Sequence, residues 1–158
     1  LAQYFCQLAV ELVPEGVESG EYLRLVLNAL HFLCEGTRPQ PVLKAIVELR
    51  MLSEAGYMPN LAYCAECGAY ESQRMYFKIN RGVLYCQNCY RDNGDPTIPL
   101  TPAALTAMRH IVFADFQRIF SFTVSPGAQQ ELADAAEAYT VSILQKRPKT
   151  LDFYHSLL

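Results

Sequence analysis

The sequence predicts a mainly α-helical protein, in which a helical bundle carries an inserted four-cysteine zinc-ribbon β-hairpin. Apolar residues recur every three or four positions along most of the chain, the spacing of helices with a buried face. Two Cys-x-x-Cys pairs interrupt this pattern and enclose a segment whose apolar residues alternate as in a strand. We therefore expect a helical domain formed by residues 1–60 and 96–158, with a zinc ribbon at residues 61–95 inserted between its two parts.

Length and composition are those of a globular domain without a strong charge bias. The 158 residues are 51% hydrophobic, and a chain of this length can bury about 70% of its unfolded surface. The net charge of −3 argues against nucleic-acid binding driven by bulk charge. No apolar run approaches the roughly 18 residues of a membrane span, and no signal peptide is visible. We therefore expect a cytoplasmic protein without a membrane partner.

The first 55 residues are expected to form three helices of a bundle. Tyr4, Phe5 and Leu8 begin the apolar face of the first helix, which ends at residues 14–16 (Pro-Glu-Gly). The second helix, with Ser19 as N-cap, is apolar on two sides and is therefore expected to be buried between neighbours. Its stripes are Tyr22, Leu25, Val26, Ala29, Phe32 and Leu33 on one side, and Leu23, Leu27, Leu30 and Cys34 on the other. The third carries Val42, Ala45, Ile46, Leu49 and Leu52, with Gly56 just after its end.

The cysteine pattern Cys64-x2-Cys67-x18-Cys86-x2-Cys89 has the spacing of a structural zinc site. Each pair can direct two sulfurs at one ion, and two pairs complete a tetrahedron that leaves no open position for catalysis. Two redox pairs are the alternative, but a redox Cys-x-x-Cys normally acts alone at a helix N-terminus. Bound zinc would contribute on the order of 10 kcal/mol to the folding of the ribbon, which has little apolar surface of its own.

The segment between the cysteine pairs is predicted to be a hairpin. Met75, Phe77 and Ile79 share one strand face. Residues 80–82 (Asn-Arg-Gly) supply turn chemistry, and residues 83–85 form the return strand.

Two further long helices are expected after the ribbon. Thr101-Pro102 provides the N-cap and first residue of one helix, and Ser125-Pro126-Gly127 begins the last long helix in the same way. Pro148 ends that last helix. The aromatic-rich stretch 113–124 is compatible with either helix or extended chain, and residues 151–158 with one short helical turn.

The chain lacks the residue patterns of common catalytic sites, so we expect no enzyme activity and no catalytic residues. It contains no His-Glu-x-x-His, no His-x-Glu before a Cys pair, no phosphate-binding glycine loop and no Gly-x-Ser-x-Gly. His31 lies in an apolar helix and is expected in the core, whereas His110 and His155, near helix ends, are expected at the surface. Cys6 and Cys34 are expected to be core thiols.

Many zinc ribbons bind nucleic acid, and this one offers basic side chains that could contact it. Arg74, Lys78 and Arg81 are possible nucleic-acid or partner contacts, with Tyr76 and Tyr85 able to stack on bases. Four acidic residues match the four basic ones in the ribbon, and a four-thiolate zinc site adds two formal negative charges. We therefore favour a structural role for the ribbon over direct binding of DNA or RNA.

The stretch from the third helix into the ribbon resembles one protein family, the bacterial recombination mediator RecO. The resemblance is most specific in residues 47–52 (Val-Glu-Leu-Arg-Met-Leu), 56–61 (Gly-Tyr-Met-Pro-Asn-Leu) and 64–68 (Cys-Ala-Glu-Cys-Gly). It continues through residues 82–86 and the Thr101-Pro102 helix start to a late Lys-Thr-Leu segment at 149–151, and so covers nearly the whole chain.

The resemblance implies an N-terminal OB-fold, a central helical domain and an inserted zinc finger. Since the sequence opens with Leu1 inside a helical pattern, we expect a fragment whose OB-fold precedes that residue. The four family cysteines correspond to Cys64, Cys67, Cys86 and Cys89.

The resemblance also implies a non-enzymatic role in recombinational DNA repair, with RecR and the single-stranded-DNA-binding protein as partners. The family anneals complementary strands and helps to place the recombinase on coated single strands, and its OB-fold would carry most of the DNA contact. The tail of the single-stranded-DNA-binding protein is acidic with apolar terminal residues, so it would need an apolar pocket rimmed by basic side chains. Lys44, Arg50 and Arg109 are possible rim charges. The alternative is a zinc-ribbon interaction or nucleic-acid-binding module of a transcription or translation factor, with an accidental resemblance.

Overall fold

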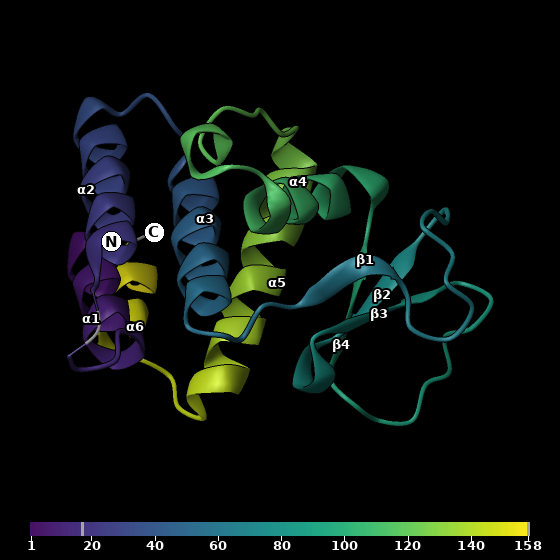
Figure 1. Ribbon diagram of the computed structural model, residues 1–158. Coiled ribbons are helices and arrows are strands. Elements are labelled where there is room, and N and C mark those ends of the chain that lie inside the picture. Colours follow the sequence, from purple (N-terminus) through teal and green to yellow (C-terminus); the bar gives the residue numbers. More distant parts are fainter. Residues whose placement is uncertain (17, 158) are drawn as a thin grey trace.

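The computed structural model describes residues 1–16 and 18–157. These residues form six α-helices and, at one end of the helical part, a four-stranded sheet (Figure 1). The helices are α1 (Ala2–Leu12), α2 (Gly20–Glu35), α3 (Gln40–Glu54), α4 (Pro102–Phe113), α5 (Pro126–Leu144) and α6 (Lys149–His155). The strands are β1 (Asn60–Cys64), β2 (Met75–Lys78), β3 (Val83–Cys86) and β4 (Thr97–Leu100), with short 3-10 turns η1 (Ile79–Arg81) and η2 (Phe116–Arg118). The predicted fold class, mainly helical with an inserted β-hairpin, is confirmed.

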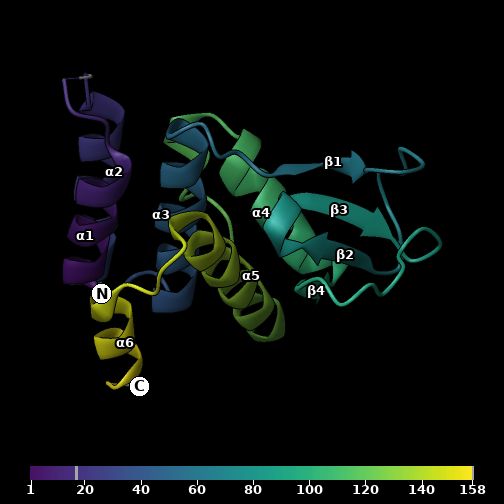
Figure 2. The ribbon, with the colours of Figure 1, turned by 90° about the horizontal axis from the view of Figure 1, so that it is seen from below.

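Helix α3 is the centre of the bundle, and α1, α2, α4 and α5 pack around it (Figure 2). Every residue from 42 to 53 except Arg50 is buried. Because this helix has neighbours on all sides, its charged residues Lys44 and Glu48 lie inside the core. Charged groups in such a position need partners there, which leads directly to the polar cluster described below.

The sheet has the strand order β1-β3-β2-β4. The predicted hairpin is its centre, where β2 and β3 pair antiparallel with Phe77 opposite Leu84. Strand β1 joins β3 in parallel, and β4 joins β2 antiparallel. Neither outer strand was predicted, since β4 has only four residues and contains Pro99. A proline is tolerated there because an edge strand leaves one side of its backbone unpaired.

The sheet shares its hydrophobic core with the bundle. Leu61, Phe77 and Leu84 are fully buried, and the core they belong to is continuous with that of the helices. The ring of Phe77 meets that of Tyr139 on α5 edge-on, at 5.5 Å between centroids. Gly82, at φ +60°, lies so close to Tyr139 that an added Cβ would be 2.8 Å from its hydroxyl oxygen.

The exposed side of α2 corrects the prediction that this helix is buried on two sides. Leu23 and Leu27 are 59% and 55% exposed. His31 and Cys34 on the same helix, and Cys6 on α1, are also exposed, so the prediction that they lie in the core is wrong. The reason is the place of α2 at the margin of the bundle, where its principal helical neighbours are α1 and α3.

The stretch 113–124, which the sequence left open, is mostly not helical. Helix α4 ends at Phe113, and the chain reaches α5 through η2 and extended residues, burying Ile119 and Phe120 on the way. The predicted cap at Thr101 is confirmed, since its Oγ1 accepts a hydrogen bond from the Ala104 amide at 3.4 Å. Within the described part of the chain, no helix is both long and apolar enough to cross a membrane.

Candidate metal centre and its charged surroundings

The four predicted cysteines come together where β1 ends at Cys64 and β3 ends at Cys86. Their four Sγ atoms all lie within 4.8 Å of one another, and those of Cys67 and Cys86 are 3.6 Å apart. Sulfurs at tetrahedral positions about 2.3 Å from one zinc ion would be separated by about 3.8 Å. The arrangement is therefore close enough to bind a metal ion, and its four soft sulfur donors fit zinc.

Two tight turns present these sulfurs. After the first pair, the Gly68 amide donates to the Cys64 carbonyl at 3.0 Å, with Gly68 in the left-handed region at φ +74°. After the second pair, the Tyr90 amide donates to the Cys86 carbonyl at 2.9 Å. No glycine is needed there, because Tyr90 is not among the described residues with positive φ. Its ring instead stacks on Tyr76 at 4.0 Å between centroids.

The pKa of the Cys64 thiol is lowered to about 6. Burial raises this pKa, but backbone hydrogen bonds from the Cys67, Cys86 and Glu66 positions outweigh it. Amide groups that point at a sulfur stabilise the thiolate, which is the form that binds a metal ion. The backbone around Cys64 thus favours a thiolate at that position. At Cys67 the Ala69 amide lowers the pKa, but the neighbouring thiols of Cys86 and Cys64 raise it above its ordinary value.

The basic residues predicted for the ribbon fall into two groups. Arg74 and Arg81 are exposed. Lys78 is only 5% exposed, and its Nζ is held by a hydrogen bond to Asn93 Oδ1 and an ion pair with Asp95. Lys78 is therefore covered by the loop after the second cysteine pair. Contact of any of the three with nucleic acid stays a prediction.

The three predicted rim charges of the helical part are directed inward. Lys44 and Arg109 are 2% and 9% exposed. Arg50 donates through Nη1 to the carbonyls of Val112 at 3.1 Å and Ala114 at 3.3 Å. It thereby satisfies carbonyls that the end of α4 leaves free. Lys44 and Arg109 are therefore buried and do not lie on a surface rim, whereas Arg50 is partly exposed. Contact of any of the three with a partner stays a prediction.

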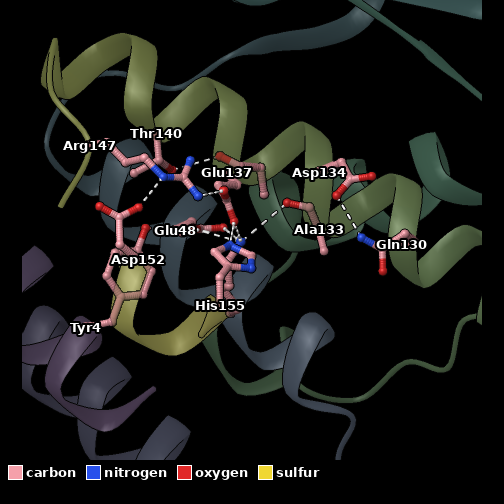
Figure 3. Close-up of polar contacts among 12 residues, drawn as sticks. Tyr4, Glu48, Gln130, Ala133, Asp134, Glu137, Thr140, Arg147, Asp152 and His155 are labelled. Atoms are coloured by element: carbon pink, nitrogen blue, oxygen red, sulfur yellow. Dashed lines mark hydrogen bonds and ion pairs between the residues drawn. The ribbon is translucent and has the colours of Figure 1, made fainter. Parts of the chain in front are cut away.

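Lys44 belongs to a cluster of charged and polar side chains, of which Tyr4, Glu48, Glu137 and Arg147 are labelled in Figure 3. Its Nζ lies 3.1 Å from Glu48 Oε1 and 2.9 Å from Glu137 Oε2. The hydroxyl of Tyr4 donates to Glu48 Oε1 at 2.7 Å. Glu137 also accepts from Arg147, at 2.9 Å. The cluster therefore joins α1, α3, α5 and the segment after α5, and it extends from the buried Lys44 and Glu48 to the half-exposed Arg147.

The surroundings set the charge state of this cluster. Burial opposes the charge of Lys44, but Glu48 and Glu137 outweigh it, and its pKa is raised. The pKa of Glu137 is lowered because Lys44 overcomes a partial burial that would raise it. Full burial dominates at Glu48 and raises its pKa to about 7, although Lys44 and Tyr4 act in the other direction. The two carboxylates share one lysine, so the difference comes from the complete burial of Glu48 and the only partial burial of Glu137.

The segment after α5 closes the cluster on its outer side. Arg147 Nε lies 2.6 Å from Asp152 Oδ1, and His155 Nε2 lies 2.7 Å from Glu137 Oε2 (Figure 3). Sequence reasoning did not find this cluster. The only local signal was the i,i+4 pair Lys44 and Glu48, whose spacing on a helix allows contact.

The fold and the site together define a helical domain with an inserted four-cysteine metal-binding ribbon. A family model described as "Recombination protein O C terminal" matches residues 1–152. The chain belongs to this family, and the predicted resemblance is confirmed.

Curated relatives carry the name "DNA repair protein RecO". The relative from Symbiobacterium thermophilum is 31% identical over 160 residues, which are 99% of this chain and 62% of that protein. The relative from Acetivibrio thermocellus is 28% identical over 156 residues, with the same coverage of 99% and 62%. The relative from Bacillus pumilus is 37% identical over 134 residues, or 82% of this chain and 51% of that protein. The chain thus spans less than two thirds of the length of these relatives.

Proposed function

We propose that this chain is the partner-binding and scaffolding part of a non-enzymatic recombination mediator of the bacterial cytoplasm and nucleoid. It would act in strand annealing and recombinase loading with RecR and the single-stranded-DNA-binding protein. The match of the family to residues 1–152 carries this proposal, and it argues against an accidental resemblance of a transcription- or translation-factor ribbon. We further propose that most of the DNA contact of the whole protein would be made by an N-terminal OB-fold, because the net charge of −3 on this chain does not favour binding to a phosphate backbone.

The ion of the cysteine site is proposed to be zinc in a structural role. Four thiolates fill the tetrahedral positions of zinc, so no position is left for a substrate or for a reactive water. The expected result of elemental analysis is one zinc per chain, lost when the four cysteines are replaced. Iron at the same stoichiometry would contradict the proposal.

A surface of arginines and phenylalanines is the best candidate for binding the tail of the single-stranded-DNA-binding protein. We call it the Arg–Phe surface; it consists of Arg24, Phe32 and Arg38 near α2, and Phe116, Arg118 and Phe122 between α4 and α5. The Arg24 guanidinium lies 4.6 Å from the Phe116 ring centroid. Arg38 donates to the Phe122 carbonyl at 3.1 Å. These contacts make the two segments one continuous surface.

An apolar groove adjoins the Arg–Phe surface. It has a volume of about 480 Å³ and lies between the start of α4 and residues 122–125. His110 and Phe122 are among its lining residues, with ring centroids 5.0 Å apart. Residues 116–125 contain Arg118 and no acidic residue. The groove would take the apolar end of the tail peptide, and the acidic residues of the peptide would contact Arg24 and the exposed Arg118.

The proposed tail site can be tested by fluorescence anisotropy with a labelled tail peptide. Replacing Arg24 and Arg118 by Ala should weaken binding on the order of tenfold at low salt, because exposed ion pairs are each worth up to roughly 1 kcal/mol. The matched control is replacement of Arg74 and Arg81, which are exposed on the ribbon, and it should leave the affinity unchanged. Equal loss in both double variants would show non-specific attraction and would remove the Arg–Phe surface as the site.

A further inference from the structure

Arg109 on α4 joins the helical bundle to the first cysteine pair. The side chain is 9% exposed. Its Nε donates to the Leu61 carbonyl at 2.7 Å, and its Nη2 donates to the carbonyls of Ala62 at 3.1 Å and Tyr70 at 2.8 Å. Leu61 and Ala62 precede Cys64, and Tyr70 follows Cys67. One guanidinium therefore holds the chain on both sides of the Cys64–Cys67 turn, which we call the first knuckle.

Two of the three hydrogen bonds hold a part of β1 whose pairing with β3 is irregular. Strand β1 lies at the edge of the sheet, and its register with β3 shifts between Asn60 and Cys64. In a regular strand, successive carbonyls point to opposite sides, yet those of Leu61 and Ala62 both reach Arg109. The guanidinium also lies 3.9 Å from the ring centroid of Tyr70. The shape of the chain that enters and leaves the first knuckle is thus bound to this one side chain.

The positive charge of Arg109 is compensated by backbone carbonyls. In residues 1–16 and 18–157 its hydrogen-bond acceptors are the three backbone carbonyls, and no carboxylate forms an ion pair with it. A buried cation is costly without a compensating charge. A metal ion of charge +2 with four thiolates carries a formal charge of −2, next to the segments that Arg109 holds. The filled cysteine site would supply the opposite charge.

We propose that Arg109 is a positioning residue of the metal centre, which keeps the Cys64–Cys67 knuckle in its metal-binding shape and couples metal occupancy to the stability of the helical bundle. Coupling of this kind is reciprocal: if Arg109 strengthens metal binding, the bound metal strengthens the attachment of α4 to the ribbon. The inference rests on zinc binding by the cysteines and is independent of the proposed repair partners.

The first test is a zinc competition titration of the whole chain with a chromophoric chelator. Loss of a group that orients metal ligands typically weakens metal binding by about 10- to 100-fold, and this is the result expected for Arg109→Met. Arg109→Lys keeps the charge but loses the fork of donors, and is expected to be weakened as well. The matched control is Arg74→Met, an exposed arginine of the same ribbon, which should bind zinc as the unchanged chain does.

The second test separates positioning from a general contribution to folding. Thermal unfolding of the bundle is followed by helical circular dichroism, with zinc and after chelation, for the unchanged chain and for Arg109→Met. The increase in Tm that zinc gives should be smaller in the variant than in the unchanged chain. If Arg109→Met does not fold, Arg109→Lys takes its place in the same comparison.

The outcomes are distinct. Equal zinc increments in Tm, together with unchanged zinc affinity, would overturn the role of Arg109 while leaving the metal site intact. Failure of the unchanged chain to bind zinc would overturn the metal assignment, and with it this inference. A reduced increment with weakened zinc affinity supports the coupling.

Discussion

The molecule has two polar centres, one in the sheet and one in the bundle, and they are built in opposite ways. The cysteine centre collects its four ligands from residues 64–89, a short stretch of chain. The cluster around Lys44 draws Tyr4, Glu48, Glu137 and Arg147 from distant parts of the chain. Local spacing therefore defines the first centre, whereas only the tertiary fold defines the second.

The two centres also differ in what they contribute to stability. A bound metal ion stabilises the folded state by a large free energy. Buried ion pairs lose most of their attraction to the cost of removing the charges from water, but become very costly when one partner is lost. The cysteine centre should therefore act as a source of stability for the ribbon, and the Lys44 cluster as a requirement for correct assembly of the bundle.

Loss of the metal should have the largest effect, and it should be confined mainly to the sheet. Replacing Cys64 and Cys67 by Ser removes a contribution on the order of 10 kcal/mol to folding of the ribbon. We expect loss of amide dispersion for residues 60–100 in NMR spectra, while the helical far-UV signal is mostly kept.

Cys6 and Cys34 provide the control for this experiment. Both are exposed and lie outside the metal site, so replacing them by Ser should change neither signal. Collapse of the helical signal in the Cys64 and Cys67 variant would show that the two regions cannot fold separately and would end the contrast drawn above.

Removal of one charge from the buried cluster should come next. Lys44→Met leaves Glu48 and Glu137 without their shared cation, which should cost about 3–5 kcal/mol of the free energy of unfolding. Lys146→Met is the control, since Lys146 is 59% exposed in its pair with Glu11 and should cost at most about 1 kcal/mol. Urea unfolding measures both, and equal losses would mean that burial of the cluster does not matter.

The contact between the two regions can be probed at Gly82. An alanine there would have the unfavourable left-handed backbone and would also clash with Tyr139 on α5. We expect a loss of about 3 kcal/mol in chemical unfolding.

A substitution at Gly94 separates the cost of the left-handed backbone from the cost of the clash with Tyr139. Its φ is +80° and an added Cβ would have no neighbour within 4 Å, so Gly94→Ala should cost only about 1 kcal/mol. Equal costs for the two variants would indicate that Tyr139 moves aside and that the seam between sheet and bundle is loosely packed.

The pH dependence of stability should show the smallest effect and should identify the cluster specifically. The pKa of Glu48 is about 7 in the folded chain, above the ordinary glutamate value of 4.5, because burial disfavours the carboxylate. The stabilising contribution of its proton is therefore complete below about pH 4.5 and is lost as the pH rises through 7. Between pH 6 and 8 this loss amounts to about 1 kcal/mol.

Glu48→Gln cannot ionise and should lack this part of the slope. Zinc-loaded protein unfolded in urea at pH 6, 7 and 8 allows the comparison, because the cysteine site contributes equally to both proteins. Parallel slopes would show that Glu48 stays ionised throughout this range beside Lys44.

Prediction from the sequence succeeded where the interacting residues are close together in the chain. The cysteine pairs, the β2–β3 hairpin and the Thr101 cap involve neighbours in the chain, and their patterns predicted them. The second apolar stripe of α2 was misleading because hydrophobicity shows that a face can be buried, but not whether a neighbour is there to bury it. Leu23 and Leu27 are exposed for that reason.

Charged residues were the hardest to place. Lys44 and Arg109 belong to residue types that usually lie at the surface. Only the tertiary structure shows that Lys44 is buried with two carboxylates and that Arg109 is buried with backbone carbonyls. Arg24 and Arg38 were overlooked because their relation to Phe116 and Phe122 depends on an irregular connection between α4 and α5. Such a segment has neither helical nor strand periodicity, so its contacts could not be predicted from the sequence.

The two outer strands have a mechanical consequence for the ribbon. The chain enters the sheet from α3 through β1 and leaves it to α4 through β4, and these strands form opposite edges of the sheet. A ribbon attached at a single edge could swing about one hinge. Here a rotation that relaxes one connection would strain the other, so the metal centre should keep a fixed orientation relative to the helices, and a partner that contacts both would meet a rigid surface.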